Sequence, residues 1–244
     1  MKNVSLLICV ILVCLFIAGA TAQKTITTTR QASGFNAVSV SSGVDLYITQ
    51  GAKESVKVEA DEDFQKYVIT KVENGTLEIF IEKDHNIGIS ISNFFKKGSL
   101  TNKLRAYVTL PELTKLNASG GSDVYSEGSW KVNALKMVAT GGSDIKFELQ
   151  GAILETNATG GSDLTLKGKI NSLTTNASGG SDVRAGDLQA DKAIVTASGG
   201  SDVTVNVTSQ LDAKANGGSD IYYRGNPVKI SKDTSGGSDI TRKN

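Results

Sequence analysis

The sequence predicts an all-β protein: a right-handed, single-stranded parallel β-helix with rungs of about nineteen residues and a less regular N-terminal β region. Three observations support this fold class. The tetrapeptide Gly-Gly-Ser-Asp occurs seven times in the second half of the chain, at intervals of 18 to 21 residues. Apolar and polar residues alternate with a period of two around each copy, which is the pattern of strands. No apolar stripe with the period of a helix runs for the length of a helix.

The first 22 residues resemble a secretory signal peptide. Lys2 precedes an almost unbroken apolar run over residues 4–18, and a small-x-small cleavage site ends at Ala22. A retained membrane anchor is the alternative, but the run is shorter than the ~20 residues that a spanning helix needs. We therefore expect residues 1–22 to be cleaved on export to the periplasm, the outer membrane surface or the exterior. The mature chain is then expected to have no membrane span.

Composition excludes several classes of function. Cys9 and Cys14 are the only cysteines and lie in the expected signal peptide, which excludes disulfides, thiol catalysis and cysteine metal sites from the mature chain. Without Lys2 the chain has 25 basic and 25 acidic residues, a balance that does not favour nucleic acid or an anionic membrane as a partner. His85 is the only histidine, so a histidine dyad and a multi-histidine metal centre are excluded as well.

Residues 23–119 are predicted to form the N-terminal β region, with irregular rungs and a cap. Alternating stretches at residues 44–48, 56–58, 77–81 and 105–110 are typical of strands, and Asn74-Gly75 between apolar runs predicts a hairpin turn. Residues 61–67 are compatible with one helical turn. The element from Ser42 to Leu46, Ser-Gly-Val-Asp-Leu, is a degenerate copy of the repeat.

Residues 83–102 are expected to leave the regular pattern. This stretch contains Phe94 and Phe95, which either pack onto the solenoid or form an exposed contact patch.

Residues 120–244 are predicted to form the repeat β-helix. An apolar residue follows every Asp of the repeat, a small residue stands two positions before every first Gly, and a mostly aliphatic one stands six positions before it. A unit of two short strands cannot bury its own apolar face, so equivalent positions are expected to stack between rungs ~4.8 Å apart. The first glycines of the seven copies are expected to mark nested corners: Gly120, Gly141, Gly160, Gly179, Gly199, Gly217 and Gly236.

The aspartates of the repeat form the one constellation that suggests chemistry. Stacking places them in one column, in which neighbouring carboxylates repel by about 0.9 kcal/mol in water and about 3.5 kcal/mol at an effective dielectric of 20. Turn N–H groups and the neighbouring Ser hydroxyls are one way to offset this repulsion. Calcium ions held between rungs are the other, and calcium is the only cofactor that we consider. The column is Asp123, Asp144, Asp163, Asp182, Asp202, Asp220 and Asp239.

Several of these features together resemble one known family. They are the export signal, the strand Phe-Asn-Ala-Val-Ser-Val at residues 35–40, the element Ser-Gly-Val-Asp-Leu-Tyr-Ile-Thr-Gln-Gly at residues 42–51, and the tandem Gly-Gly-Ser-Asp rungs. The chain resembles the DUF2807 family, a group of auto-transporter adhesin head domains that is common in Bacteroidota. The resemblance implies a right-handed parallel β-helix exposed outside the inner membrane. One departure from the family's description is expected: residues 241–244 follow the last rung directly, without a translocator barrel or a sorting domain.

A non-catalytic binding module is the function that we expect. A repeating surface suits a repeating ligand, a glycan or a protein surface, and the outward positions include Tyr125, Thr165, Arg184, Thr204 and Tyr222. A carbohydrate-active enzyme is an alternative, because Arg184 and Tyr222 each follow an aspartate of the column by two positions. Near-identical repeats argue against it, since an enzyme needs one asymmetric pocket. A purely structural envelope protein is the third class.

Overall fold

The computed structural model describes residues 24–82 and 104–243, and most of these residues lie in strands. The expected signal peptide, both cysteines, His85 and the stretch with Phe94 and Phe95 lie outside the described residues. The N-terminal elements are β1 (Thr25–Arg30), β2 (Ala37–Val40), β3 (Asp45–Gln50), β4 (Ser55–Asp61), the 3-10 turn η1 (Gln65–Tyr67), β5 (Val68–Glu73), β6 (Thr76–Ile81), β7 (Arg105–Leu110) and β8 (Lys115–Ser119). The remaining strands are β9 (Val124–Glu127), β10 (Trp130–Thr140), β11 (Asp144–Thr159), β12 (Asp163–Ser178), β13 (Asp182–Ser198), β14 (Asp202–Asn216), β15 (Asp220–Arg224), β16 (Lys229–Ser235) and β17 (Asp239–Arg242).

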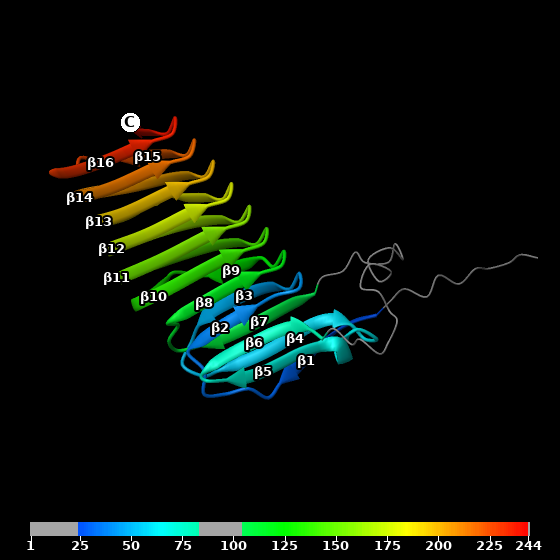
Figure 1. The fold of residues 1–244 in the computed structure, drawn as a ribbon. Coiled ribbons are helices and arrows are strands. Elements are labelled where there is room, and N and C mark those ends of the chain that lie inside the picture. Colours follow the sequence, from blue (N-terminus) through cyan, green and yellow to red (C-terminus); the bar gives the residue numbers. More distant parts are fainter. Residues whose placement is uncertain (1–23, 83–103, 244) are drawn as a thin grey trace, which may run out of the picture.

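Strands β8 to β17 form the predicted parallel β-solenoid, in which each rung pairs in register with the next (Figure 1). The register follows the repeat, so that Ala139 lies opposite Ala158, and Ala158 lies opposite Ala177. Each rung has two sides. The first side, which begins at the Asp of the repeat, consists of β9, the first halves of β11 to β14, β15 and β17. The second side consists of β8, β10, the second halves of β11 to β14, and β16.

The prediction of two short strands in every unit is wrong for the middle rungs. Strands β11 to β14 are 15 to 17 residues long and cover both sides of their rungs. Their pairing with neighbouring rungs continues around the second corner, for example from Ile170 opposite Ala190 to Ser172 opposite Lys192. Between β13 and β14 the register shifts at this corner, between Ala190 and Lys192. The ladder therefore bends at this corner without ending.

The Gly-Gly steps form the first corner, as predicted, and appear as tight hooks at the arrowheads of the long strands (Figure 1). The first glycine of each of the seven pairs has φ between 62° and 71° and the second has φ between 73° and 79°. A Cβ atom on Gly160 would lie 3.3 Å from the backbone nitrogen of Gly141 in the previous rung, whereas one on Gly161 would meet nothing within 4 Å. The corners therefore nest through their first glycines.

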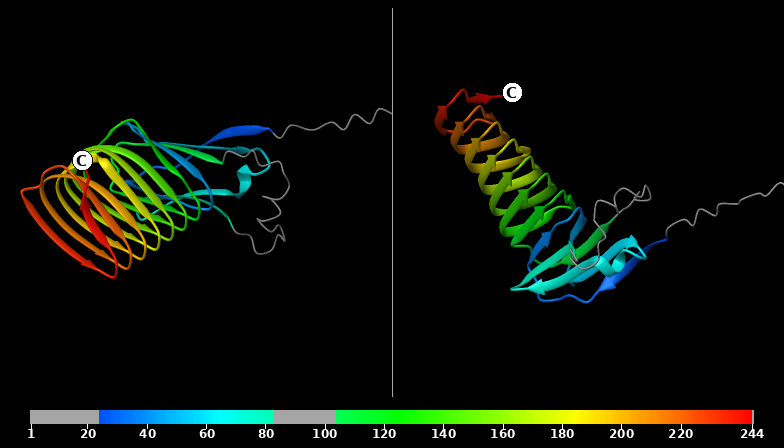
Figure 2. Two further views of the ribbon diagram at one scale, coloured as in Figure 1. Left: turned by 90° about the horizontal axis from the view of Figure 1, so that it is seen from above. Right: turned by 45° about the vertical axis from the view of Figure 1, so that its right-hand side comes forward.

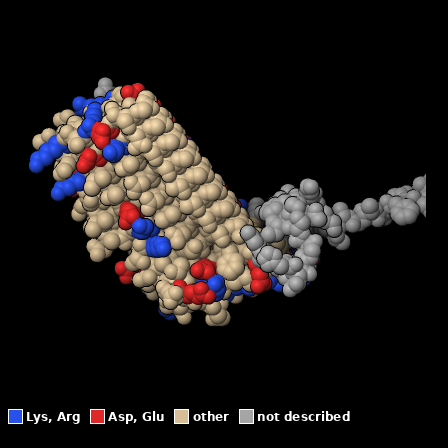
Figure 3. Space-filling model, viewed as in Figure 1, with Lys and Arg blue, Asp and Glu red and all other residues tan. Residues whose placement is uncertain are grey.

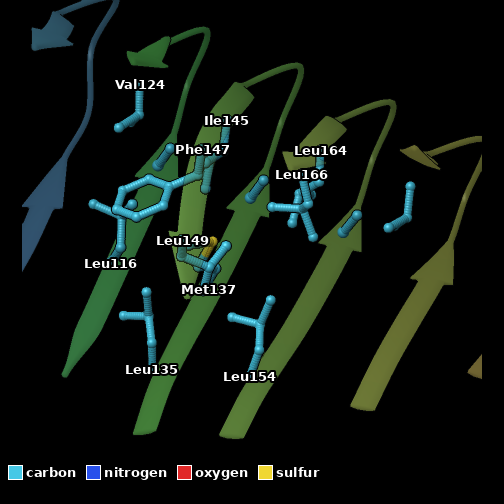
Figure 4. Packing of buried hydrophobic residues seen from close by; sticks show 14 of the residues in the cluster. Leu116, Val124, Leu135, Met137, Ile145, Phe147, Leu149, Leu154, Leu164 and Leu166 are labelled. Carbon is cyan, nitrogen blue, oxygen red and sulfur yellow. The ribbon is translucent and has the colours of Figure 1, made fainter. Parts of the chain in front are cut away.

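The core fills the space between the two sides of the rungs (Figure 4). Residues after the repeat Asp, such as Ile145 and Leu164, and aliphatic residues of the opposite side, such as Leu135 and Leu154, all lie in this core and are buried. The predicted columns hold from β9 to β15. They fail in the last rung, where Ile230 is 46% exposed.

The N-terminal region continues the parallel stacking, first through β2 and β3 and then through β6 and β7, and adds antiparallel strands at its end. Strand β2 pairs in parallel with β8 and β6, and β3 pairs in parallel with β9 and β7. Strands β1, β4 and β7 are antiparallel neighbours, as are β5 and β6 (Figure 2). The predicted hairpin at Asn74 and Gly75 is present, with φ of 50° and 72°, and η1 lies within the predicted helical turn. Within residues 24–82 and 104–243, no helix is long and apolar enough to span a membrane.

Candidate functional site

The repeat aspartates lie on the outer surface of one side of the solenoid, which we call the aspartate face. Parallel register stacks them rung above rung; for example, Asp144 pairs with Asp163, and Asp163 with Asp182. The predicted column of seven carboxylates is therefore present. Asp202 and Asp239 are exposed and the other five are half-buried.

The serines of the repeat do not bind this column, contrary to one of our expectations. Successive residues of a strand point to opposite faces, so each Ser lies inside the corner while the following Asp points outward. Ser122, Ser143, Ser162, Ser181, Ser201 and Ser219 are 0% exposed. Each repeat Ser from the first to the seventh accepts a backbone N–H from the rung before, at N···O distances of 3.1 to 3.3 Å. The hydroxyls thus form an internal ladder that joins the corners.

Other groups offset the repulsion between the carboxylates. The guanidinium of Arg184 donates to Asp163 Oδ2 and to Asp182 Oδ2, both at 2.7 Å. The backbone N–H of Asp202 donates to Asp182 Oδ1 at 3.4 Å. Two hydroxyls donate to the aspartate two positions earlier, from Tyr125 to Asp123 at 3.2 Å and from Tyr222 to Asp220 at 3.0 Å. The backbone N–H of Asp239 likewise donates to Asp220 Oδ1 at 3.2 Å, so Asp182 and Asp220 each accept a backbone N–H from the next rung.

Burial and neighbouring charges shift the pKa of several groups on the aspartate face. Burial raises the pKa of Asp144, and the charges of Asp123 and Asp163 raise it further. Burial, followed by the charge of Asp123, raises the pKa of Tyr125 to about 12. The hydrogen bond to Asp163 raises the pKa of Arg184, which therefore stays charged. A hydrogen bond from the backbone of Asp163 and the charge of Lys146 lower the pKa of Asp144, but burial and the neighbouring carboxylates outweigh them.

An eighth carboxylate, Asp45, extends the column, and our sequence analysis missed it. Ser42 and Gly43 have φ of 67° and 74° and stack on the first Gly-Gly corner, while the N–H of Val44 donates to Ser122 Oγ at 3.1 Å. Burial and the charge of Asp123 raise the pKa of Asp45, whereas Arg105 lowers it. The degenerate repeat copy was the signal that could have identified this residue.

A stack of tyrosines lies beside the column at its N-terminal end. The ring centroid of Tyr47 is 5.4 Å from that of Tyr107 and 5.2 Å from that of Tyr125. Tyr107 donates to Glu59 Oε2 at 2.8 Å, and Arg105 lies 5.7 Å from the ring centroid of Tyr47. Antiparallel β4 supplies Glu59, and β7 supplies Arg105, so no repeat pattern in the sequence could place them here.

The tyrosines begin a second outward column on the aspartate face. All its members except Tyr107 stand two residues after an aspartate in the sequence. Strand register places its members in successive rungs. They include all five outward residues that the sequence predicted, and each is half-buried or exposed. The column is Tyr107, Tyr47, Tyr125, Lys146, Thr165, Arg184, Thr204 and Tyr222.

The described carboxylates do not form a recognisable metal centre. No group of three or more His, Cys, Asp or Glu residues in the described part of the chain is arranged to hold a metal ion. The calcium hypothesis therefore depends on carboxylates acting in pairs together with backbone or water oxygens.

Comparisons with known proteins agree with this architecture. The model of the DUF2807 family, described as "putative auto-transporter adhesin, head GIN domain", matches residues 34–227. No curated protein is significantly similar in sequence.

Several solved structures share the fold. A putative adhesin from Bacteroides fragilis is 23% identical, with a TM-score of 0.79 over 91% of this chain and 98% of that one. A putative lipid binding protein from Parabacteroides distasonis is 22% identical, with a TM-score of 0.72 over 90% and 97% of the two chains. A putative adhesin from Parabacteroides merdae is 16% identical, with a TM-score of 0.66 over 91% and 97%.

Proposed function

The chain belongs to the DUF2807 family, and from that premise we propose that it is an exported, non-catalytic binding module of the cell envelope. Its ligand on this proposal is an extended glycan that lies along the aspartate face. The names of the family and of the solved structures support an adhesin-like role. The expected signal peptide supports export.

One observation carries the proposal: two polar columns run side by side along the aspartate face in register with the rungs. The first column supplies carboxylates, which accept hydrogen bonds, and the second supplies tyrosine and threonine hydroxyls with Lys146 and Arg184. A polysaccharide displays hydroxyl groups at a regular spacing, so these columns can meet the same group in successive rungs. Many weak, repeated hydrogen bonds then add up to useful affinity.

The aspartates are less suited to catalysis. Asp163 and Asp182 are both bound by Arg184, so neither carboxylate is free to act as a general acid or base at that rung. We therefore assign Arg184 the role of holding the two carboxylates in position.

A glycan array probed with the protein tests the proposal, together with a matched pair of variants. Thr165 and Thr174 are both half-buried outward residues of β12, but they lie on opposite sides of the solenoid. We expect Thr165→Arg to weaken binding of the best glycan about tenfold or more, and Thr174→Arg to leave it unchanged. Loss of binding in Thr174→Arg alone would move the site to the other side.

The same assays distinguish the other functions. Turnover of a bound polysaccharide would support the carbohydrate-active enzyme instead. Binding of proteins but of no glycan would make a protein surface the ligand, and binding of neither would favour a structural role in the envelope.

A further inference from the structure

The hydrophobic core ends at the last rung because this rung has basic and polar residues at inward positions. On β14 the inward positions are Leu211, Ala213 and Ala215, all buried. Their register partners on β16 are Ile230, Lys232 and Thr234. On the other side, the inward column that passes through Tyr223 reaches Arg242 on β17. Two basic residues at inward positions prevent another apolar rung from stacking here, whatever follows in the chain.

The end face of this rung is open. Strand β16 pairs with β14, and β17 pairs with β15, and neither has a strand on its other edge within the described residues. All seven residues of β16 are exposed, and Val228, just before it, is 88% exposed. The side chain of Lys232 crosses the end face, where its Nζ donates to the carbonyl of Ile240 at 3.1 Å and lies 4.6 Å from the ring centroid of Tyr223. A free strand edge can accept another extended chain.

The end face is also basic. None of its cations forms an ion pair within the described residues, and the one ion pair of this rung joins Asp233 to Lys214 of the rung before. Figure 3 shows Lys and Arg at the C-terminal end of the molecule, with some Asp and Glu among them, whereas the strip over the Gly-Gly corners is free of charge. The cations of the last rung that lie at the end face are Lys229, Lys232 and Arg242. Arg224 instead reaches back toward Gly186 of β13, and the Nζ of Lys243 lies 3.2 Å from the ring centroid of Tyr222.

These charges select among the chains that an open edge can accept. A second copy stacked on the same end would bring two basic end faces together, and like charges placed opposite each other across a strand pair are destabilising. An acidic strand would neutralise them while its backbone completes the ladder. Charge complementarity thus favours an acidic partner and disfavours self-association.

We propose that the rung formed by β16 and β17 is a docking surface for an extended, acidic polypeptide segment, which adds to the solenoid as one more strand. This surface is the free edge of the last rung, which meets the aspartate face only at Asp239, so it gives the protein a second partner at one end of the rod. The aspartate face remains free along the side.

Three short acetylated peptides test this proposal by isothermal titration calorimetry with the intact protein. In the first, Glu alternates with Val; in the second, Lys alternates with Val; in the third, Glu alternates with Pro, which keeps the charge but cannot form a strand ladder. We expect only the Glu/Val peptide to bind and to slow hydrogen exchange of backbone amides in β16 and β17. Equal affinity for the Glu/Pro peptide would show that charge alone explains binding, and it would refute the addition of the peptide as a strand.

A matched pair of variants locates the site. Lys232→Glu should weaken the Glu/Val peptide roughly tenfold, because an attractive charge becomes a repulsive one. Lys167→Glu, which changes an exposed lysine of β12 several rungs away, should leave its affinity unchanged. Circular dichroism checks that both variants fold. Absence of binding in the parent protein, or undiminished binding in Lys232→Glu, would refute the proposal.

Discussion

The nesting of the Gly-Gly corners makes a prediction about two adjacent glycines with nearly the same backbone conformation. Gly160 has φ of 69° and Gly161 has φ of 74°, so alanine is strained at both positions by about 1 kcal/mol. Only Gly160 approaches the previous rung, since its added Cβ would lie 3.3 Å from the nitrogen of Gly141. Overpacking of this kind costs a further 1–3 kcal/mol or so. We therefore expect losses of about 1 kcal/mol for Gly161→Ala and about 2–4 kcal/mol for Gly160→Ala.

Urea and thermal unfolding followed by circular dichroism measure this difference. For a chain of this length, each 1 kcal/mol shifts the midpoint temperature by about 2–4 °C. Gly161→Asn serves as a control for backbone strain, because asparagine tolerates the left-handed region better than alanine, and it should lose less stability than Gly161→Ala. Equal losses for the two alanine variants, or a larger loss for Gly161→Ala, would refute the nested arrangement of the corners.

Three further predictions concern the corner and the aspartate column. Ser181→Ala removes the acceptor of a buried N–H and should lower the free energy of unfolding by urea by about 1–3 kcal/mol. The control Ser178→Ala, on the outer surface, should lower it by less than about 0.5 kcal/mol. Equal losses would contradict the internal hydroxyl ladder. The raised pKa of Asp144 means that its contribution to stability is present below the ordinary aspartate pKa of about 3.9 and is lost as the pH rises through the higher folded-state pKa. Asp144→Asn should therefore stabilise the protein at pH ~7 and not at pH ~3, and an equal gain at both would show that the charge is not the cause. Calcium, compared with a chelator, should leave the midpoint of thermal unfolding unchanged; a rise that disappears in the double variant Asp163→Asn, Asp182→Asn would establish a cation site.

The repeat region could be predicted well because every rung is built from the same short sequence pattern. Spacing of the Gly-Gly-Ser-Asp copies sets the register, and the inward positions follow from alternation along the strand. The continuous course of β11 to β14 around the second corner was not predictable, because no recurring tetrapeptide marks that corner as Gly-Gly-Ser-Asp marks the first.

The candidate site was only partly predictable, since its N-terminal end is built by contacts that are distant in sequence. Arg105 and Tyr107 reach the column through the pairing of β7 with β3, and Glu59 arrives on antiparallel β4. The roles of the repeat serines were also misjudged. Alternation places Ser and Asp on opposite surfaces of the strand, and this rule should have excluded a bond between neighbours.

The proposed binding of an extended ligand along the aspartate face is tested most directly by the dependence of affinity on ligand length. Once the array has identified a glycan, size-fractionated oligosaccharides of that glycan are titrated into the protein by isothermal titration calorimetry. A column of repeated weak contacts predicts that affinity keeps rising with each added sugar until the oligosaccharide spans the column. An affinity that reaches its maximum with two or three sugars would contradict the account, because it would indicate one local pocket.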